Sequence, residues 1–133
     1  GLAAVFFFST DEWKYRSSWL LIGAIITTLI VFGIKFLVRR RRPAGDWGQI
    51  YRKTDPHSFP SGHAARAVLF AVLVAFLGPL WLAIILACWA PCVILARVSM
   101  GVHYLSDVLA GALLGAGIGG AMVWIIPQTS FPF

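Results

Sequence analysis

The longest uncharged stretch of the sequence most limits what this chain can fold into. Ala67–Ala96 covers 30 residues without a charged side chain. A membrane-spanning helix needs about 20 apolar residues, so this stretch is too long for one ordinary span. Gly78 and Pro79 interrupt it and favour a turn over a continuous helix. The stretch therefore predicts two antiparallel membrane helices, the first of which runs from about His63 to Leu77.

Two further segments are apolar enough to span a membrane. Ser17–Val38 is 22 residues long, and its one charged residue, Lys35, lies close to its end. Val108–Ile126 is uncharged. The helix that starts near His63 is short for a complete crossing, which fits a start below the membrane surface, in a polar cavity walled by other helices. We predict an all-α, polytopic transmembrane helix bundle with four full spanning helices, forming a single domain over residues 1–133.

The N-terminal segment predicts part of another helix. Gly1–Phe8 is apolar but covers less than half of a bilayer, and Asp11–Arg16 is expected to form a polar turn after it. No initiating Met or basic segment precedes the apolar residues, so the pattern does not predict a signal peptide. We expect an N-terminal partial helix that ends an earlier helix, so that the domain lacks N-terminal helices. A segment lying on the membrane surface is the alternative.

Composition excludes two classes of protein. The chain is 59% hydrophobic and 12% charged, whereas a soluble domain carries about 25% charged residues. The net charge is +6, but the basic residues lie at the ends of apolar segments and form no stripe along a polar face. This distribution argues against nucleic-acid binding. Cys88 and Cys92 lie four apart in an apolar stretch, and we predict that they pack in the membrane rather than bind a metal or form a disulfide.

Ionisable and small polar residues are predicted to meet at one end of the bundle. Every second crossing returns the chain to the same side of the membrane, and ionisable side chains at membrane depth are costly and commonly mark a functional site. Counting crossings places together Lys35, Arg42, Ser61, His63, Arg97, His103 and Asp107.

The residue types at this site suit a phosphoryl group. Ser61 is a good helix N-cap, and Gly62 lets the backbone come close to a ligand. The free N–H groups of that helix start and the positive end of its dipole form an anion site. Lys35, Arg42 and Arg97 can surround a phosphoryl group. Fixed cations and N–H donors stabilise the charge of phosphoryl transfer, so we predict no metal and no cofactor.

Two histidines fit a two-step transfer. His103 and Asp107 are four residues apart and would share one face of a helix. Asp107 could then accept the Nδ1 proton of His103 and leave Nε2 unprotonated, as a nucleophile or base. His63 supplies a second imidazole that can act as an acid or base near neutral pH. This pair predicts transfer through a covalent intermediate.

Three spaced motifs are similar to those of a known family. In order, they are Lys35-x6-Arg42-Pro43, Pro60-Ser61-Gly62-His63 and Arg97-x5-His103-x3-Asp107. Together they resemble the three-part signature of the type 2 phosphatidic acid phosphatase (PAP2) superfamily. The resemblance implies a metal-independent membrane phosphatase that acts on a lipid phosphate or pyrophosphate, with phosphatidic acid, phosphatidylglycerol phosphate and polyprenyl pyrophosphate as candidate substrates. It also implies a multi-pass protein of the cell membrane, and the sequence leaves open on which side the site lies.

The resemblance implies a role for each matched residue. His103 is the expected nucleophile that becomes phosphohistidine, and Asp107 is expected to orient it. His63 is expected to protonate the leaving group and later to activate water. Ala96 stands where the third motif usually begins with Ser, so we expect weaker phosphate binding or a narrower substrate range. The expected phosphate-binding residues are Lys35, Arg42, Ser61, Gly62 and Arg97.

Two other functions stay open at this point. A lipid phosphotransferase of the same fold would pass the phosphoryl group to another lipid instead of water. A non-enzymatic membrane transport or lipid-binding protein would use the histidines for proton relay or packing. Members of this family usually have six membrane helices, so the four predicted here supply only part of the lipid-facing wall that selects a substrate.

Residues outside the motifs have plainer interpretations. Arg39–Arg41 are expected to anchor the chain to anionic lipid headgroups, with a direct part in catalysis as the alternative. Asp55 and His57 are expected to lie in a solvated loop. Arg66 lies one turn after His63, where it either lines the same cavity or snorkels to the membrane surface. Glycine recurs at every fourth position in Gly111, Gly115 and Gly119. This repeat predicts close helix packing, with a homodimer contact as an alternative.

Overall fold

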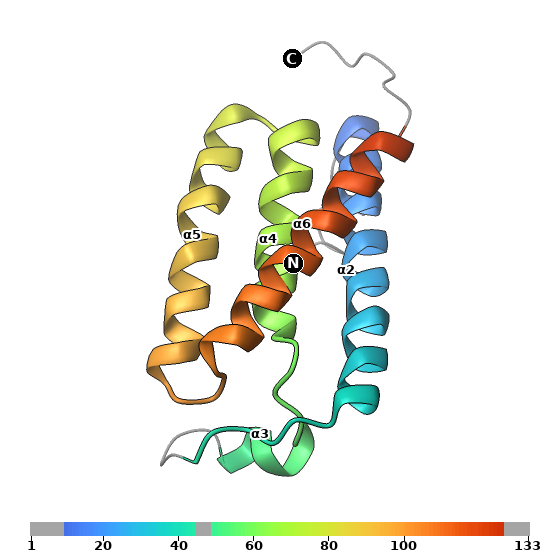
Figure 1. Ribbon diagram of the computed structural model, residues 1–133. Coiled ribbons are helices and arrows are strands. Elements are labelled where there is room, and N and C mark those ends of the chain that lie inside the picture. Colours follow the sequence, from blue (N-terminus) through green and yellow to red (C-terminus); the bar gives the residue numbers. More distant parts are fainter. Residues whose placement is uncertain (1–9, 45–48, 127–133) are drawn as a thin grey trace.

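Five helices make up the part of the chain that the structure describes. The structure is a computed structural model, and it describes residues 10–44 and 49–126. The helices are α2 (Asp11–Val38), α3 (Gln49–Thr54), α4 (Gly62–Leu77), α5 (Leu80–Ser99) and α6 (Leu105–Ile125). Figure 1 shows the four long helices side by side, with the short α3 beyond one end of them. The predicted all-α class is confirmed.

The number of full spans differs from the prediction. α2, α5 and α6 have 28, 20 and 21 residues and are long and apolar enough to cross a membrane. α4 has 16 residues, which at about 1.5 Å per residue is about 24 Å, less than a hydrocarbon core of about 30 Å. The prediction of four full spanning helices is therefore wrong by one, because α4 begins directly after the buried N-cap Ser61 and ends before Gly78. The predicted partial helix at Gly1–Phe8 lies outside the described residues.

Two helix starts also differ from the prediction. Asp11–Arg16, expected as a polar turn, forms the beginning of α2. The helix dipole favours acidic residues there, and Asp11 pairs with Lys14 at 3.1 Å. α6 begins at Leu105, before the predicted span Val108–Ile126 but after His103, because Oδ2 of Asp107 accepts the N–H of the N-cap residue Tyr104 at 2.8 Å.

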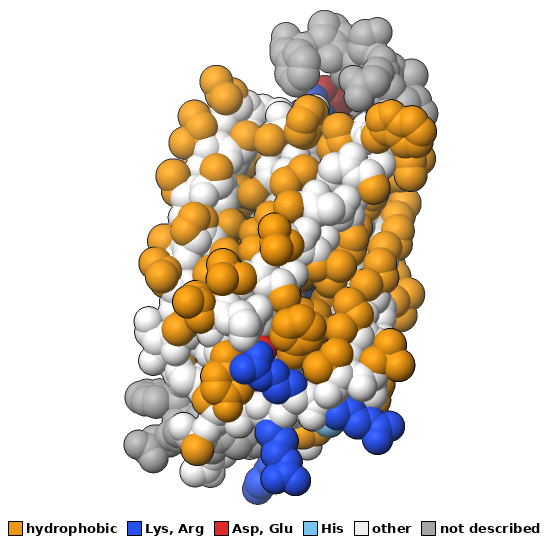
Figure 2. All heavy atoms as spheres, in the orientation of Figure 1, with side chains coloured by type: hydrophobic (Ala, Val, Ile, Leu, Met, Phe, Trp, Pro, Cys, Tyr) orange, Lys and Arg blue, Asp and Glu red, His pale blue; other side chains and the backbone are white. Residues whose placement is uncertain are grey.

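α4 lies at the centre of the bundle. It packs against α2, α5 and α6, and its fully buried side chains include Ala64, Ala65, Leu69 and Leu73. Figure 2 shows hydrophobic side chains over most of the visible surface, with Lys and Arg gathered at the end where α2 stops. An apolar outer surface suits lipid surroundings, where small residues between helices allow close packing.

Small residues on one face of α6 allow the closest helix contact. A Cβ atom at Gly111 would lie 2.4 Å from the carbonyl oxygen of Ser61, and one at Gly115 would lie 2.1 Å from that of Ala65. A Cβ atom cannot approach an oxygen so closely, so glycine is needed for α4 and α6 to meet at this separation. The predicted close helix packing is therefore confirmed within one chain. The alternative homodimer contact is not tested by this packing.

We expect Gly115→Ala to lower the free energy of unfolding by about 1–3 kcal/mol, because the added methyl group meets the Ala65 carbonyl oxygen and pushes the helices apart. Gly117→Ala is the matched control, since a Cβ there meets no described atom within 4 Å and Ala favours a helix. Thermal unfolding in detergent measures both variants. An equal effect of the two substitutions would contradict the packing described here.

Candidate active site

A small cavity lies at the end of the bundle where α2 stops and α4 begins. Its volume is about 70 Å³, enough for a small anion. Ser61 and Asp107 are fully buried beside its lining residues, and the N–H of Ser61 donates to the carbonyl oxygen of Asp107 at 2.9 Å. The structure therefore brings the predicted site residues together, and both imidazoles face one cavity. The predicted residues that line it are Lys35, Arg42, Gly62, His63, Arg97 and His103.

The start of α4 forms one wall of this cavity. Ser61 is the N-cap, as predicted, and its Oγ accepts the N–H of Ala64 at 3.4 Å. A Cβ atom at Gly62 would lie 3.4 Å from Val31 and 3.5 Å from a guanidinium nitrogen of Arg66, so the helix start is closely surrounded. Helix N-termini present free N–H groups and a partial positive charge, which suits this wall to an anion.

Two of the predicted phosphate-binding cations share one carboxylate. Arg42 donates from Nη2 to Oδ2 of Asp55 at 2.9 Å and from Nε to its backbone oxygen at 2.7 Å. Lys35 Nζ pairs with the same Oδ2 and donates to the backbone oxygen of His57 at 2.9 Å. The expectation of a solvated loop is therefore wrong for Asp55 and His57, which are partly buried against the site. The carboxylate of Asp55 therefore supplies a negative charge between Lys35 and Arg42.

A backbone pairing returns this loop to the bundle. Arg41 and His57 form an antiparallel β-bridge, and the N–H of Ser58 donates to the carbonyl oxygen of Arg40 at 2.8 Å. These bonds join the segment before α3 to the segment after it. No local sequence pattern marks such a pairing, which is why Asp55 looked solvated in the sequence.

His103 lies in the turn between α5 and α6, and not on a helix. The turn includes Gly101, whose φ of 62° lies in the region that glycine adopts readily. The prediction that His103 and Asp107 share a helix face is therefore wrong, although the two side chains still approach. Nδ1 of His103 lies 3.7 Å from Oδ2 of Asp107, which is an ion-pair distance and too long for a hydrogen bond.

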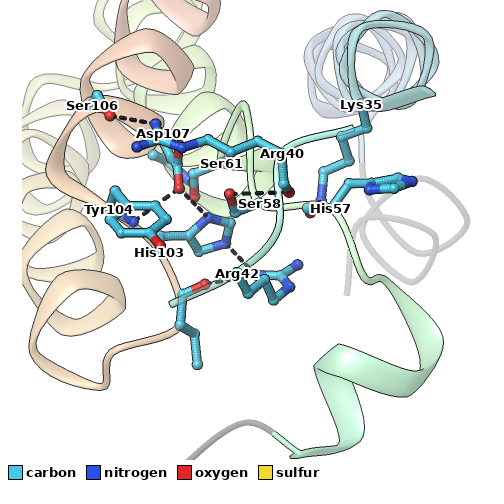
Figure 3. A network of polar contacts seen from close by, with 12 residues as sticks. Lys35, Arg40, Arg42, His57, Ser58, Ser61, His103, Tyr104, Ser106 and Asp107 are labelled. Carbon is cyan, nitrogen blue, oxygen red and sulfur yellow. Dashed lines mark hydrogen bonds and ion pairs between the residues drawn. The ribbon is translucent and has the colours of Figure 1, made fainter. Parts of the chain in front are cut away.

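The contact made by Nε2, the other ring nitrogen of His103, identifies the tautomer of the ring. Nη1 of Arg42 lies 3.0 Å from Nε2 of His103 (Figure 3). A guanidinium can only donate, so Nε2 accepts, and the neutral ring carries its proton on Nδ1, towards Asp107. Nε2 is therefore the unprotonated nitrogen, which is the state that a nucleophile needs.

Electrostatics keep His103 neutral at physiological pH. Burial, with the nearby positive charges of Arg42 and Arg97 added, lowers the pKa of His103 to about 3. Burial also lowers the pKa of Arg42, against the opposing effect of the Asp55 carboxylate, and the guanidinium stays charged. The cations around the ring therefore remain charged while the imidazole remains neutral.

Arg40 is a residue of this site that the sequence did not single out. Its Nη1 donates to Oδ1 of Asp107 at 2.9 Å and to Oγ of Ser106 at 2.6 Å (Figure 3). Its guanidinium carbon also lies 4.1 Å from the centre of the Tyr104 ring, a cation–π distance. For Arg40, this contact favours a place in the site over the expected anchoring to lipid headgroups. In a run of four arginines, no sequence signal distinguishes the one that reaches a buried carboxylate.

Arg66 lines the cavity, which decides between the two positions left open for it. Its Nη1 donates to Oγ1 of Thr28 on α2 at 3.3 Å, so the side chain stays inside the bundle.

Within the described ranges, no three side chains of His, Cys, Asp or Glu lie close enough together to hold a metal ion. Cys88 and Cys92 are free and exposed on α5. The metal independence of the reaction stays a prediction.

Comparisons with known proteins agree with this fold. The sequence profile of the PAP2 superfamily matches residues 17–131. Decaprenylphosphoryl-5-phosphoribose phosphatase of Mycobacterium tuberculosis is 39% identical over 111 residues, which are 80% of this chain and 60% of that protein. Undecaprenyl-diphosphatase of Sulfolobus acidocaldarius is 33% identical over 102 residues, which are 74% of this chain and 50% of that protein. The chain thus spans about half to three fifths of the length of these relatives.

A solved structure shares the fold. The PAP2-type phosphatidylglycerolphosphate phosphatase from Bacillus subtilis matches with a TM-score of 0.76 at 26% sequence identity, over 98% of this chain and 67% of that one. The profile match includes all three motifs, from Lys35 to Asp107. Three helices are long and apolar enough to span a bilayer, and the resemblance found in the motifs is confirmed. This membrane protein belongs to the PAP2 superfamily.

Proposed function

We propose that this chain removes a phosphoryl group from a membrane lipid through a phosphohistidine at His103. The observation that carries the proposal is a neutral, buried imidazole whose unprotonated Nε2 belongs to a cavity with cationic walls. The relatives named above are a decaprenylphosphoryl-5-phosphoribose phosphatase and an undecaprenyl-diphosphatase, which supports a lipid substrate with a terminal phosphoryl group. A multi-pass protein of the cell membrane would meet such a headgroup at the edge of the bilayer.

Binding of the scissile phosphoryl group is the first step. Its oxygens lie against Lys35, Arg42 and Arg97 and against the N–H groups at the start of α4. They replace the carboxylate of Asp55 as the partner of Lys35 and Arg42. Arg42 then turns from Nε2 of His103 to the phosphoryl group, and this frees the lone pair of Nε2. Binding therefore activates the nucleophile while it neutralises the cations.

Transfer to His103 is the second step. Nε2 attacks phosphorus as the bond to the lipid oxygen breaks. The negative charge of the bound phosphoryl group offsets the surrounding cations and lets His63 carry a proton, which it donates to that oxygen. The cations stabilise the negative charge that spreads over the three equatorial oxygens. The phosphohistidine ring is positively charged at Nδ1–H, and the nearby carboxylate of Asp107 stabilises it.

Hydrolysis of the intermediate is the third step. His63, now neutral, takes a proton from a water molecule whose oxygen attacks phosphorus. The bond to Nε2 breaks, inorganic phosphate leaves, and His103 returns to its neutral form. A lipid phosphotransferase would differ in the acceptor alone, which would be a lipid hydroxyl group in place of water.

We expect His103→Ala to reduce phosphate release below detection, because no covalent intermediate can form. His63→Ala should lower the rate by about 10²–10⁴-fold, since the leaving group loses its acid. Release of inorganic phosphate from phosphatidic acid and from polyprenyl diphosphate in detergent measures both variants. The wild-type assay is repeated in EDTA, where we expect unchanged activity.

A fully active His103→Ala protein would refute the assigned nucleophile. Loss of wild-type activity in EDTA, restored by a divalent ion, would contradict the metal-independent mechanism. Phosphoryl transfer that needs an added lipid alcohol, with no release of free phosphate in its absence, would favour the phosphotransferase.

Arg40→Gln should lower kcat by about tenfold, because Asp107 loses the cation that neutralises its carboxylate and holds it in place. It should also raise the pKa of His103, since unbalanced negative charge on Asp107 favours the imidazolium. ¹⁵N NMR of His103 in detergent measures this titration, which a merely structural effect would not move. Arg41→Gln removes the same charge from an exposed side chain and is the control. An equal shift in both variants would count against a specific role for Arg40.

A further inference from the structure

We infer that Arg66 is a further phosphoryl-binding residue of this site, and that the hydroxyl group of Thr28 on α2 holds it in place. Arg66 lies outside the three motifs. The assignment rests on the proposed phosphatase function. To that function it adds a fourth cation on the same scissile phosphoryl group, and a residue that positions this cation.

The guanidinium of Arg66 lies at the start of its own helix. Side chains of an α-helix lean towards its N-terminal end, so Arg66 reaches back along α4 to Gly62, four residues earlier. Nη1 and Nη2 lie 3.5 Å and 3.8 Å from the position of a Cβ atom at Gly62. The guanidinium is therefore next to the first N–H groups of α4, which have no partner within the helix and suit an anion.

Arg66 shares one cavity with the expected phosphate-binding cations. Lys35, Arg42 and Arg97 line the same space of about 70 Å³. A cavity of this size brings the cations on its walls close to one small anion. We therefore expect a phosphoryl group that meets Lys35, Arg42 and Arg97 to meet Arg66 as well.

The charge of Arg66 is balanced differently from that of two of these cations. Asp55 pairs with both Lys35 and Arg42, so a bound phosphoryl group has to displace a carboxylate from them. Within the described ranges, Arg66 forms no ion pair, and its hydrogen bond goes to a neutral hydroxyl group. A half-buried cation in an apolar bundle is costly unless an anion approaches it. A phosphoryl group would supply that negative charge.

Thr28 fixes the direction of this guanidinium. Its Oγ1 donates to the carbonyl oxygen of Ala24 at 2.7 Å, which uses its hydroxyl hydrogen. Its lone pairs are left to accept, and Nη1 of Arg66 donates to them at 3.3 Å. This bond uses one of the five N–H groups of the guanidinium, whose planar fork can donate to two phosphoryl oxygens. The hydrogen bonds from Arg66 to Ala24 thus connect α2 to the phosphoryl-binding end of α4.

Arg66 acts on the non-bridging oxygens of the scissile group, on the side of α4. Negative charge spreads over these oxygens as the phosphoryl group passes to Nε2 of His103. A fixed cation beside them stabilises the transition state as well as the bound substrate. Loss of Arg66 should therefore lower both the affinity for phosphate and the rate of the reaction.

Binding of inorganic phosphate tests this assignment without turnover. Isothermal titration of the full chain in detergent measures the affinity for orthophosphate, and phosphate release from phosphatidic acid measures kcat/KM. We expect Arg66→Gln to lower each value by about tenfold or more. Arg66→Lys keeps the charge but not the planar fork, so it should lower the affinity by about threefold. Arg41→Gln removes the same charge from an exposed side chain and should change either value by less than about twofold.

Thr28→Val tests the positioning role. Valine keeps the shape of threonine and removes the acceptor, so orthophosphate binding should weaken by about two- to fivefold. Thr27→Val is the matched control on the same helix. Thr27 is fully buried, and its hydroxyl group makes no hydrogen bond within the described part of the chain. In Arg66→Gln protein, Thr28→Val should cause no further loss of affinity, because Thr28 acts through Arg66. An additive loss, or an equal effect of Thr27→Val, would overturn this role.

Thermal unfolding separates binding from a structural role. Without ligand, Arg66→Gln should not lower the unfolding temperature, because it removes a cation that has no acidic partner among the described residues. Orthophosphate should then raise that temperature less than it does in the wild type. A lower temperature without ligand and an unchanged rise with orthophosphate would show that Arg66 is structural.

Equal orthophosphate affinity in wild-type and Arg66→Gln protein would overturn the assignment and leave the phosphatase function standing. Where Arg66→Gln does not fold, unchanged affinity in Arg66→Lys would overturn it. A wild type that neither binds orthophosphate nor releases it from phosphatidic acid or polyprenyl diphosphate would refute the proposed function, and the assignment with it.

Discussion

Positive charge held at membrane depth is the constraint on which the rest of this structure depends. Lys35 and Arg97 are 4% and 7% exposed at the ends of apolar helices, where an uncompensated charge is costly. Asp55 lowers that cost for Lys35 and for Arg42 by returning to the bundle after α3. The protein thus keeps a carboxylate where the proposed substrate brings a phosphoryl group, so that binding exchanges one anion for another.

The same charges connect the packing of the helices to the chemistry. The glycine face of α6 lets the backbone at Ser61 come within hydrogen-bond distance of Asp107, so the second and third motifs meet. Arg42 donates a hydrogen bond to Nε2 of His103, and Arg40 neutralises the carboxylate of Asp107, which faces Nδ1. The nucleophile, its positioning groups and the phosphate-binding cations therefore form one electrostatic unit, in which a change to any charge alters the others.

The framework of this protein could be predicted from local sequence chemistry, and several contacts could not. The break after Leu77 and the N-cap at Ser61 depend on neighbouring residues alone, so the sequence is sufficient for both. Asp55 was misplaced because its position depends on a backbone pairing across α3. Arg40 could not be told from identical neighbours. The spacing of His103 to Asp107 suits a helix, but a turn followed by the Tyr104 cap also brings the two side chains together.

Trapping the covalent intermediate tests the central claim most directly. The His63→Ala protein is mixed with a lipid whose terminal phosphoryl group is radiolabelled, and the reaction is stopped in alkali, in which phosphohistidine is stable. We expect labelled protein whose label is lost in acid and maps to His103, and we expect no label when His103→Ala is added to the same protein. Label that maps to another residue, or label that persists without His103, would contradict the account.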